Sequence, residues 1–84
     1  MKMIQSEIER IFNEANQDDK DLLTYKISDN AVIFIHSGPA LPGTCLSSLI
    51  KITKKKNLSF IGIMYIANNN NFGIVFEVAN IGNR

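Results

Sequence analysis

Four consecutive asparagines, Asn68 to Asn71, separate two long apolar segments in the second half of the chain. Asparagine tolerates the left-handed backbone conformation that a tight turn requires, and the flanking segments are rich in β-branched and aromatic residues. The sequence therefore predicts a β-hairpin with strands over residues 58–67 and 72–79. A two-residue loop and a four-residue loop both pair Ala67 with Phe72, which sets the register of the two strands.

This register distributes apolar side chains over both faces of a sheet. We expect one face to pack against helices, because it is entirely apolar. The opposite face is also mostly apolar, with Glu77 as its single charge. The expected core face holds Ile61, Ile63, Tyr65, Phe72, Ile74, Phe76 and Val78, and the other face holds Leu58, Phe60, Gly62, Met64, Ile66, Val75, Glu77 and Ala79.

The first half of the chain predicts another hairpin, with strands over residues 22–28 and 31–36. An Asp29-Asn30 turn joins them and pairs Ser28 with Ala31. The opposite side of this hairpin is again partly apolar. The expected core side holds Leu23, Tyr25, Ile27, Val32 and Phe34, and the other side holds Thr24, Lys26, Ile33 and Ile35.

A helix is expected before each hairpin. The first, over residues 2–17, carries its apolar residues at the spacing of one helical face. The second runs from Thr44, a candidate N-cap, to Lys56, with Asn57 as its stop. The predicted buried faces are Ile4, Ile8, Ile11, Phe12 and Ala15 in the first helix, and Cys45 or Leu46 with Leu49, Ile50 and Thr53 in the second.

These elements predict one domain over residues 1–84, because a chain of this length is at the small end of what folds unaided. The composition, 45% hydrophobic and 20% charged, is ordinary for a globular protein. We expect an α+β fold in the order αββαββ, with a four-stranded, mostly antiparallel sheet and both helices packed on one face. The strand order is left open.

The second apolar face suggests a function. A monomer's largest exposed apolar patch is usually about 300–600 Å², and the side chains on this face reach that size. We expect a non-catalytic protein-protein interaction or regulatory module that docks a partner or forms a homodimer through this face or through the edge of a strand. In the alternative, one helix or a terminus packs on that side and makes a three-layer domain. The candidate interface residues are Ile33, Ile35, Phe60, Met64, Ile66 and Val75.

A second reading is a weak nucleic-acid binder. Residues 1–42 carry four basic and seven acidic residues, a net charge of −3, whereas residues 43–84 carry five basic and one acidic, a net charge of +4. The basic half includes a cluster that suits contact with phosphates. The alternative is a solvated helix end, neutralised by the acidic first helix. The cluster is Lys51, Lys54, Lys55 and Lys56.

A third reading is a small thiol-dependent enzyme. Cys45 stands near the start of the second helix, where the helix dipole favours a thiolate, and His36 ends the strand before it. A buried structural cysteine is the simpler interpretation.

One histidine and one cysteine give no metal-ligand spacing, and nothing indicates a cofactor. A single cysteine, no signal-peptide pattern and no long apolar stretch predict a cytoplasmic protein without a membrane span.

Overall fold

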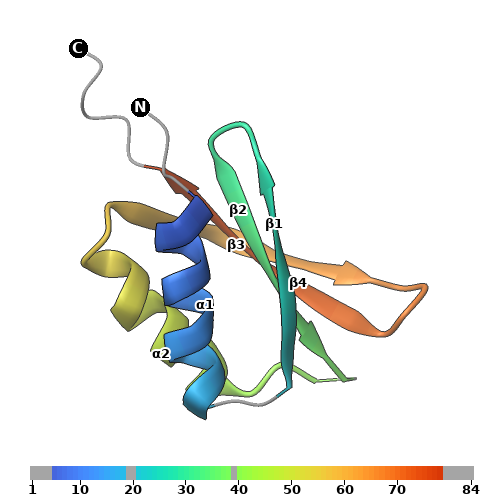
Figure 1. Ribbon diagram of the computed structural model, residues 1–84. Coiled ribbons are helices and arrows are strands. Elements are labelled where there is room, and N and C mark those ends of the chain that lie inside the picture. The colour runs from blue at the N-terminus through green and yellow to red at the C-terminus, as the bar shows by residue number, and fades with distance from the viewer. Residues whose placement is uncertain (1–4, 19–20, 39, 79–84) are drawn as a thin grey trace.

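A computed structural model describes residues 5–18, 21–38 and 40–78 of the chain (Figure 1). Two helices, each followed by two strands, give the predicted order αββαββ, so the predicted α+β fold is confirmed. Residues 2–4 of the expected first helix lie outside the described residues, as do Asp19, Lys20, Pro39 and Ala79. The elements are α1 (Gln5–Asp18), β1 (Leu22–Ser28), β2 (Ala31–Ser37), α2 (Gly43–Lys54), β3 (Leu58–Ile66) and β4 (Asn71–Val78).

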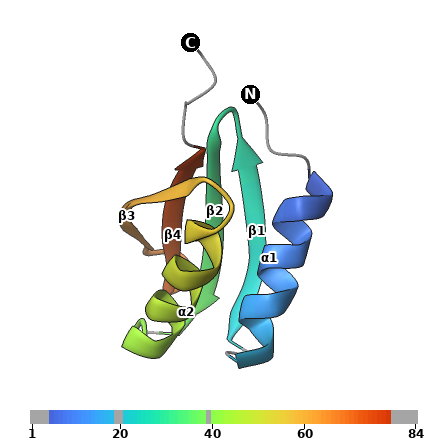
Figure 2. The same cartoon turned by 90° about the vertical axis from the view of Figure 1, so that its left-hand side faces the viewer.

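The four strands form one antiparallel sheet in the order β1-β2-β4-β3. Both helices lie on the same face, side by side in front of the sheet in Figure 2. We call this the helix-side face and the opposite one the outer face. No described helix or strand covers the outer face, so within these ranges the domain has two layers and neither helix makes a third, while both termini named in the alternative lie outside the described residues.

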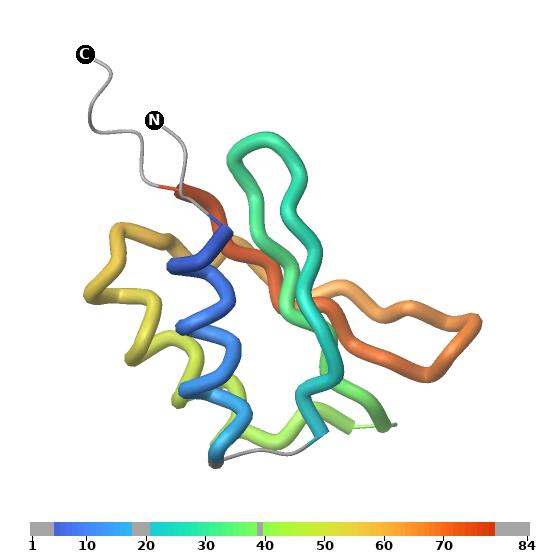
Figure 3. The backbone as a smooth tube through the Cα atoms, in the orientation of Figure 1, coloured from blue at the N-terminus to red at the C-terminus, as the bar shows by residue number. Residues whose placement is uncertain are grey.

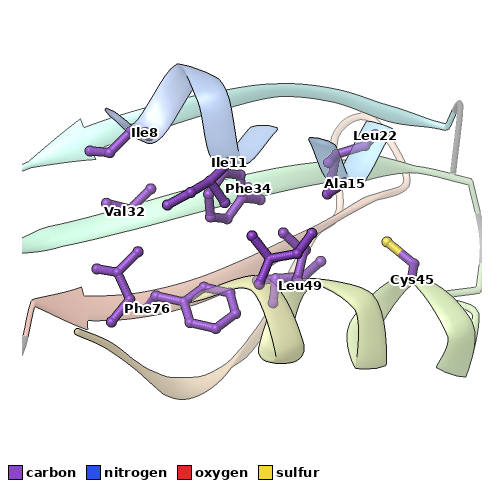
Figure 4. Packing of buried hydrophobic residues seen from close by; sticks show 12 residues of the cluster. Ile8, Ile11, Ala15, Leu22, Val32, Phe34, Cys45, Leu49 and Phe76 are labelled. Atoms are coloured by element: carbon purple, nitrogen blue, oxygen red, sulfur yellow. The ribbon is translucent and has the colours of Figure 1, made fainter. Parts of the chain in front are cut away.

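The core lies between the helices and the two central strands, β2 and β4 (Figure 4). Phe34 and Phe76 meet there edge to face, with ring centroids 5.8 Å apart. This geometry is the one that aromatic quadrupoles favour. Ile8, Ile11 and Ala15, spaced three and four residues apart, turn the predicted face of α1 onto the sheet. The buried apolar residues are Ile8, Ile11, Ala15, Leu22, Val32, Phe34, Cys45, Leu49, Ile52, Leu58, Ile74 and Phe76.

Helix α2 begins one residue earlier than predicted, and Thr44 is not its cap. The N-cap is Pro42, in extended conformation and with no side-chain hydrogen bond. Its carbonyl accepts hydrogen bonds from the backbone N–H groups of Cys45 and Leu46, at 3.1 and 3.3 Å. Proline suits this position because its fixed φ is compatible with the extended N-cap. At the other end the helix stops at Lys54, two residues earlier than predicted, with Lys55 as its C-cap, and Asn57 adopts φ 62° in the turn that follows.

The first hairpin has the predicted register, with Ser28 opposite Ala31 and Asp29 at positive φ in the turn. A register shift between Leu22 and Thr24 changes its far end. The bulge turns Leu22 into the core and Leu23 into solvent. The expectation that Leu23 belongs to the core was therefore wrong, because strict alternation does not hold across a bulge. Ile27 lies opposite Val32 on the predicted side but is 42% exposed, so its assignment to the core was also wrong.

The second hairpin departs further from the predicted register. Tyr65, not Ala67, lies opposite Phe72, and a four-residue loop connects Ile66 to Asn71. Since this displacement is by two residues, Ile63, Met64 and Tyr65 keep their predicted faces. The pairing of Ala67 with Phe72 was wrong.

A second bulge, between Phe60 and Gly62, reverses the faces of the first residues of β3. Phe60 lies opposite Phe76 on the helix-side face, with ring centroids 5.7 Å apart, and Leu58 lies in the core. Placing Phe60 and Leu58 on the outer face was therefore wrong. Ile61, expected in the core, is exposed at the bulge.

The helices also cover less of the sheet than expected. In Figures 1 and 3 the turn end of the β3–β4 hairpin projects beyond both helices. Ile63 and Tyr65 face the helix side there, yet both are exposed. A strand of nine residues spans about 30 Å, whereas a helix of twelve spans about 18 Å, so α2 cannot cover the hairpin along its whole length.

Ile63 and Ile74 test this description because they are direct cross-strand neighbours with opposite exposure, 45% and 0%. We expect Ile74→Ala to lower the free energy of unfolding by about 2–5 kcal/mol, because it leaves a cavity in the core. Ile63→Ala is expected to cost about 1 kcal/mol or less, because it removes a half-solvated side chain. Urea unfolding of both variants measures the difference, and equal losses would contradict the description.

Candidate protein interface

The outer face carries a contiguous apolar patch at its centre. Ile33 on β2 lies opposite Val75 on β4, while Ile35 and Met64 flank Gly73 from the two sides. Ile66 follows Met64 on the same face of β3. Five of the six predicted interface residues thus lie together, and Phe60 alone lies on the other face. We call this set the outer patch: Ile33, Ile35, Met64, Ile66 and Val75.

Gly73 shapes the middle of the outer patch. A Cβ atom placed on it would lie 2.9 Å from Cγ of Met64 and 3.0 Å from Cγ2 of Ile33. The Met64 and Ile33 side chains therefore close over the glycine backbone, which is buried although it belongs to the uncovered face. Met64 is nevertheless 47% exposed, so it forms the raised part of the patch.

Strand β3 is an edge of the sheet and the most exposed apolar element of the described chain. Its nine residues include no charge and no proline. Two exposed side chains, Ile63 and Tyr65, point to the helix side, while Met64 points to the outer side. We call the exposed apolar side chains of this strand the β3 strip: Phe60, Ile61, Ile63, Met64 and Tyr65.

Sequence reasoning missed most of the β3 strip, because it assigned Ile61, Ile63 and Tyr65 to the core. One available signal was Gly62, since a glycine inside a strand often marks a bulge. Another was the length of the predicted strand relative to the helix before it. Together they indicate two things about β3. The alternation of its side chains between the two faces is interrupted near its start, and no helix covers its end.

Tyr65 is held in place although it is exposed. Its ring packs against Phe72 with centroids 5.2 Å apart, and its hydroxyl donates a hydrogen bond to Oδ1 of Asn70 in the turn. The polar group is therefore satisfied within the hairpin, and the ring remains available to a partner. An aromatic side chain fixed before binding loses little conformational entropy on binding.

Polar residues border the outer patch. Lys26 lies beside Ile33 on the β1 side, and Thr24 lies beside Ile35. At the end nearest the Asp29-Asn30 turn, Glu77 stands between Ala31 and Ser59. An apolar centre within a polar border is the usual anatomy of a protein interface.

The basic cluster lies elsewhere, at the end of α2 on the helix side. Lys51, Lys54 and Lys55 are exposed and Lys56 is half-buried. Lys51 and Glu14 line the same groove of about 640 Å³ between the two helices, so the acidic first helix does face part of the cluster. This placement supports the solvated helix end more than a phosphate-binding surface, which needs an extended positive area.

Cys45 and His36 are both core residues. Cys45 is 2% exposed, and its sulfur points from α2 toward the sheet in Figure 4. His36 is buried on the helix-side face of β2, in register with Leu22.

No group of three or more histidine, cysteine or acidic side chains in the described ranges is arranged to hold a metal ion. Likewise, no described helix is long and apolar enough to cross a membrane.

The burial of Cys45 predicts its reactivity. We expect a thiol reagent such as 5,5′-dithiobis(2-nitrobenzoate) to label the native protein at least tenfold more slowly than the unfolded protein, because the sulfur is exposed only when the domain opens. Labelling in urea provides the reference rate. Equal rates in the two states would show that the thiol is accessible and would revive the thiol-enzyme reading.

Gly73 supplies another prediction about the outer patch. Gly73→Ala forces Met64 and Ile33 apart, an overpacking cost of about 1–3 kcal/mol that the gain in strand propensity offsets only in part. Gly62→Ala is the control, because nothing lies within 4 Å of its Cβ position. We expect the first variant to unfold at lower urea concentration than wild type and the second to unfold no earlier. The reverse order would contradict the described contact.

The chain has no match among protein-family models, and neither the curated proteins nor the solved structures contain one that is significantly similar to it.

Proposed function

We propose that this protein is a non-catalytic interaction module that binds a protein partner through the outer patch and the adjoining β3 strip. The observation that carries the proposal is an apolar sheet face, uncovered by any described element, which continues onto an uncharged edge strand. Soluble monomers rarely leave such a surface in water, because covering it is favourable by about 25 cal/mol per Å².

The arrangement of residues favours binding over chemistry. The exposed groups are aliphatic, thioether and aromatic, and the polar end of Tyr65 is already hydrogen-bonded within its own hairpin. The two groups considered for catalysis, Cys45 and His36, are buried on the other side of the sheet. A regulatory protein that acts by occupying a partner's surface needs exposed apolar and aromatic side chains of this kind and no reactive group.

Met64→Glu tests the proposal, because it places a charge at the most exposed point of the outer patch. We expect the immobilised variant to lose at least tenfold in its capacity to retain either a partner protein or untagged copies of the chain. The control is Leu23→Glu, which charges an equally exposed apolar residue, 52% against 47%, on the opposite edge strand.

Urea unfolding of both variants shows whether the domain remains folded, so that a loss of binding is not mistaken for a loss of structure. If folded Met64→Glu retains every partner that wild type retains, the outer patch is not the docking surface. If Leu23→Glu loses binding to the same extent, the effect is one of net charge and not of position.

A further inference from the structure

We propose that the partner is a second copy of this chain, and that the two copies join by antiparallel pairing of β3 with β3. This inference rests on the proposed function and names the occupant of the same surface. It adds a specific geometry, in which the edge of the sheet, and not its outer face alone, makes the contact.

The two edges of the sheet differ in how well they are protected. Edge strands carry backbone N–H and C=O groups that lack a neighbouring strand, and soluble proteins usually protect them with charges, prolines or covering elements. β1 carries Lys26 and lies against α1. β3 is longer, has no charge and no proline, and exposes its side chains on both faces. It is the edge that is left open to pairing.

The exposed side chains of β3 are self-complementary. A two-fold axis perpendicular to the sheet at Met64 places Met64 beside the partner's Met64. It also places Ile63 beside the partner's Tyr65, on the helix side. Every pair is apolar and no like charges meet, which is the condition for isologous strand pairing. The bulge between Phe60 and Gly62 limits the regular ladder to residues 62–66.

The area of the contact is small. Within residues 62–66 the exposed side chains are Ile63, Met64 and Tyr65, which expose on the order of 300 Å² per copy, judged from typical side-chain areas and their exposed fractions. Two copies thus offer on the order of 600 Å², to which the paired backbones add, against the roughly 1,000 Å² that a specific interface needs. We therefore expect a reversible, concentration-dependent dimer and not a permanent one.

The dimer has a defined architecture. Two four-stranded sheets join into one sheet of eight strands, with all four helices on the same side. The two outer patches become neighbours on the opposite side and form one apolar surface across the junction. Ile63, on the helix side, takes part in strand pairing but would take no part in a dimer formed by stacking outer faces. This difference separates the two modes of association.

The decisive experiment combines solution mass with amide hydrogen exchange of the full chain from about 10 μM to about 1 mM, a range that brackets weak interfaces of this size. We expect mass to double across the range while amides of residues 62–66 that point away from β4 become protected. In the monomer these amides have no strand partner and exchange quickly.

Two variants test the same contact. Ile63→Glu and Met64→Glu should each raise the dissociation constant of the dimer at least tenfold, with Leu23→Glu as the unaffected control.

Cross-linking provides a second measurement. In a Cys45→Ala background, Met64→Cys should form a disulfide-linked dimer on mild oxidation, because residues directly opposite in antiparallel strands have Cβ atoms about 4.5–5.5 Å apart. Leu23→Cys, on the other edge and equally exposed, should form at least tenfold less. Equal cross-linking of the two variants would indicate random collision and would count against β3 pairing.

The remaining outcomes separate this inference from the function on which it rests. A dimer that Met64→Glu disrupts while Ile63→Glu and the β3 amides remain unaffected overturns strand pairing and leaves a face-to-face interaction. A dimer insensitive to both variants overturns strand pairing, and the proposed function then depends on whether Met64→Glu loses retention of a different protein. A strict monomer at the highest concentration overturns the second-copy inference, and retention of a different protein, lost in Met64→Glu, then supports the proposed function alone.

Discussion

The packing of α1 and α2 on β2 and β4 determines the rest of this structure. Phe34 and Phe76 meet edge to face at its centre, and the buried residues of both helices surround them. Since the two helices use their apolar faces on this one side, nothing described remains to cover the other side of the sheet. The outer patch is thus a direct result of where the core forms, and the binding role that we propose depends on it.

The sequence predicted the number, type and order of the elements because these depend on local patterns. Helical periodicity identified α1, and the Asp29-Asn30 and asparagine turns marked the two hairpins. It also placed most of the outer patch, because Ile33, Ile35 and Val75 lie on β2 and β4, which pair with each other in unbroken register. On regular backbone the pattern gave a side chain's direction but not its burial, since Ile27 and Ile50, both expected in the core, are 42% and 36% exposed.

The errors came from departures that alternation cannot encode. A bulge places Phe60 on the helix side and Ile61 in solvent, and a bulge in β1 exchanges the roles of Leu22 and Leu23. Ile63 was assigned to the right face but to the wrong environment, because periodicity gives a side chain's direction and not the length of the helix above it. Burial depends on this three-dimensional overlap, which no single element contains.

The strand order also has a consequence for how the chain folds. β1 with β2 and β3 with β4 are hairpins whose partners are close in sequence, whereas β2 and β4 pair residues as distant as Ala31 and Glu77. Joining the two halves therefore requires closure of a long loop, an entropic cost that precedes any gain from the central contacts. Until β4 is synthesised, the nascent chain cannot form the β2–β4 pairing that joins its two halves. Cooperative folding of the domain therefore depends on that pairing.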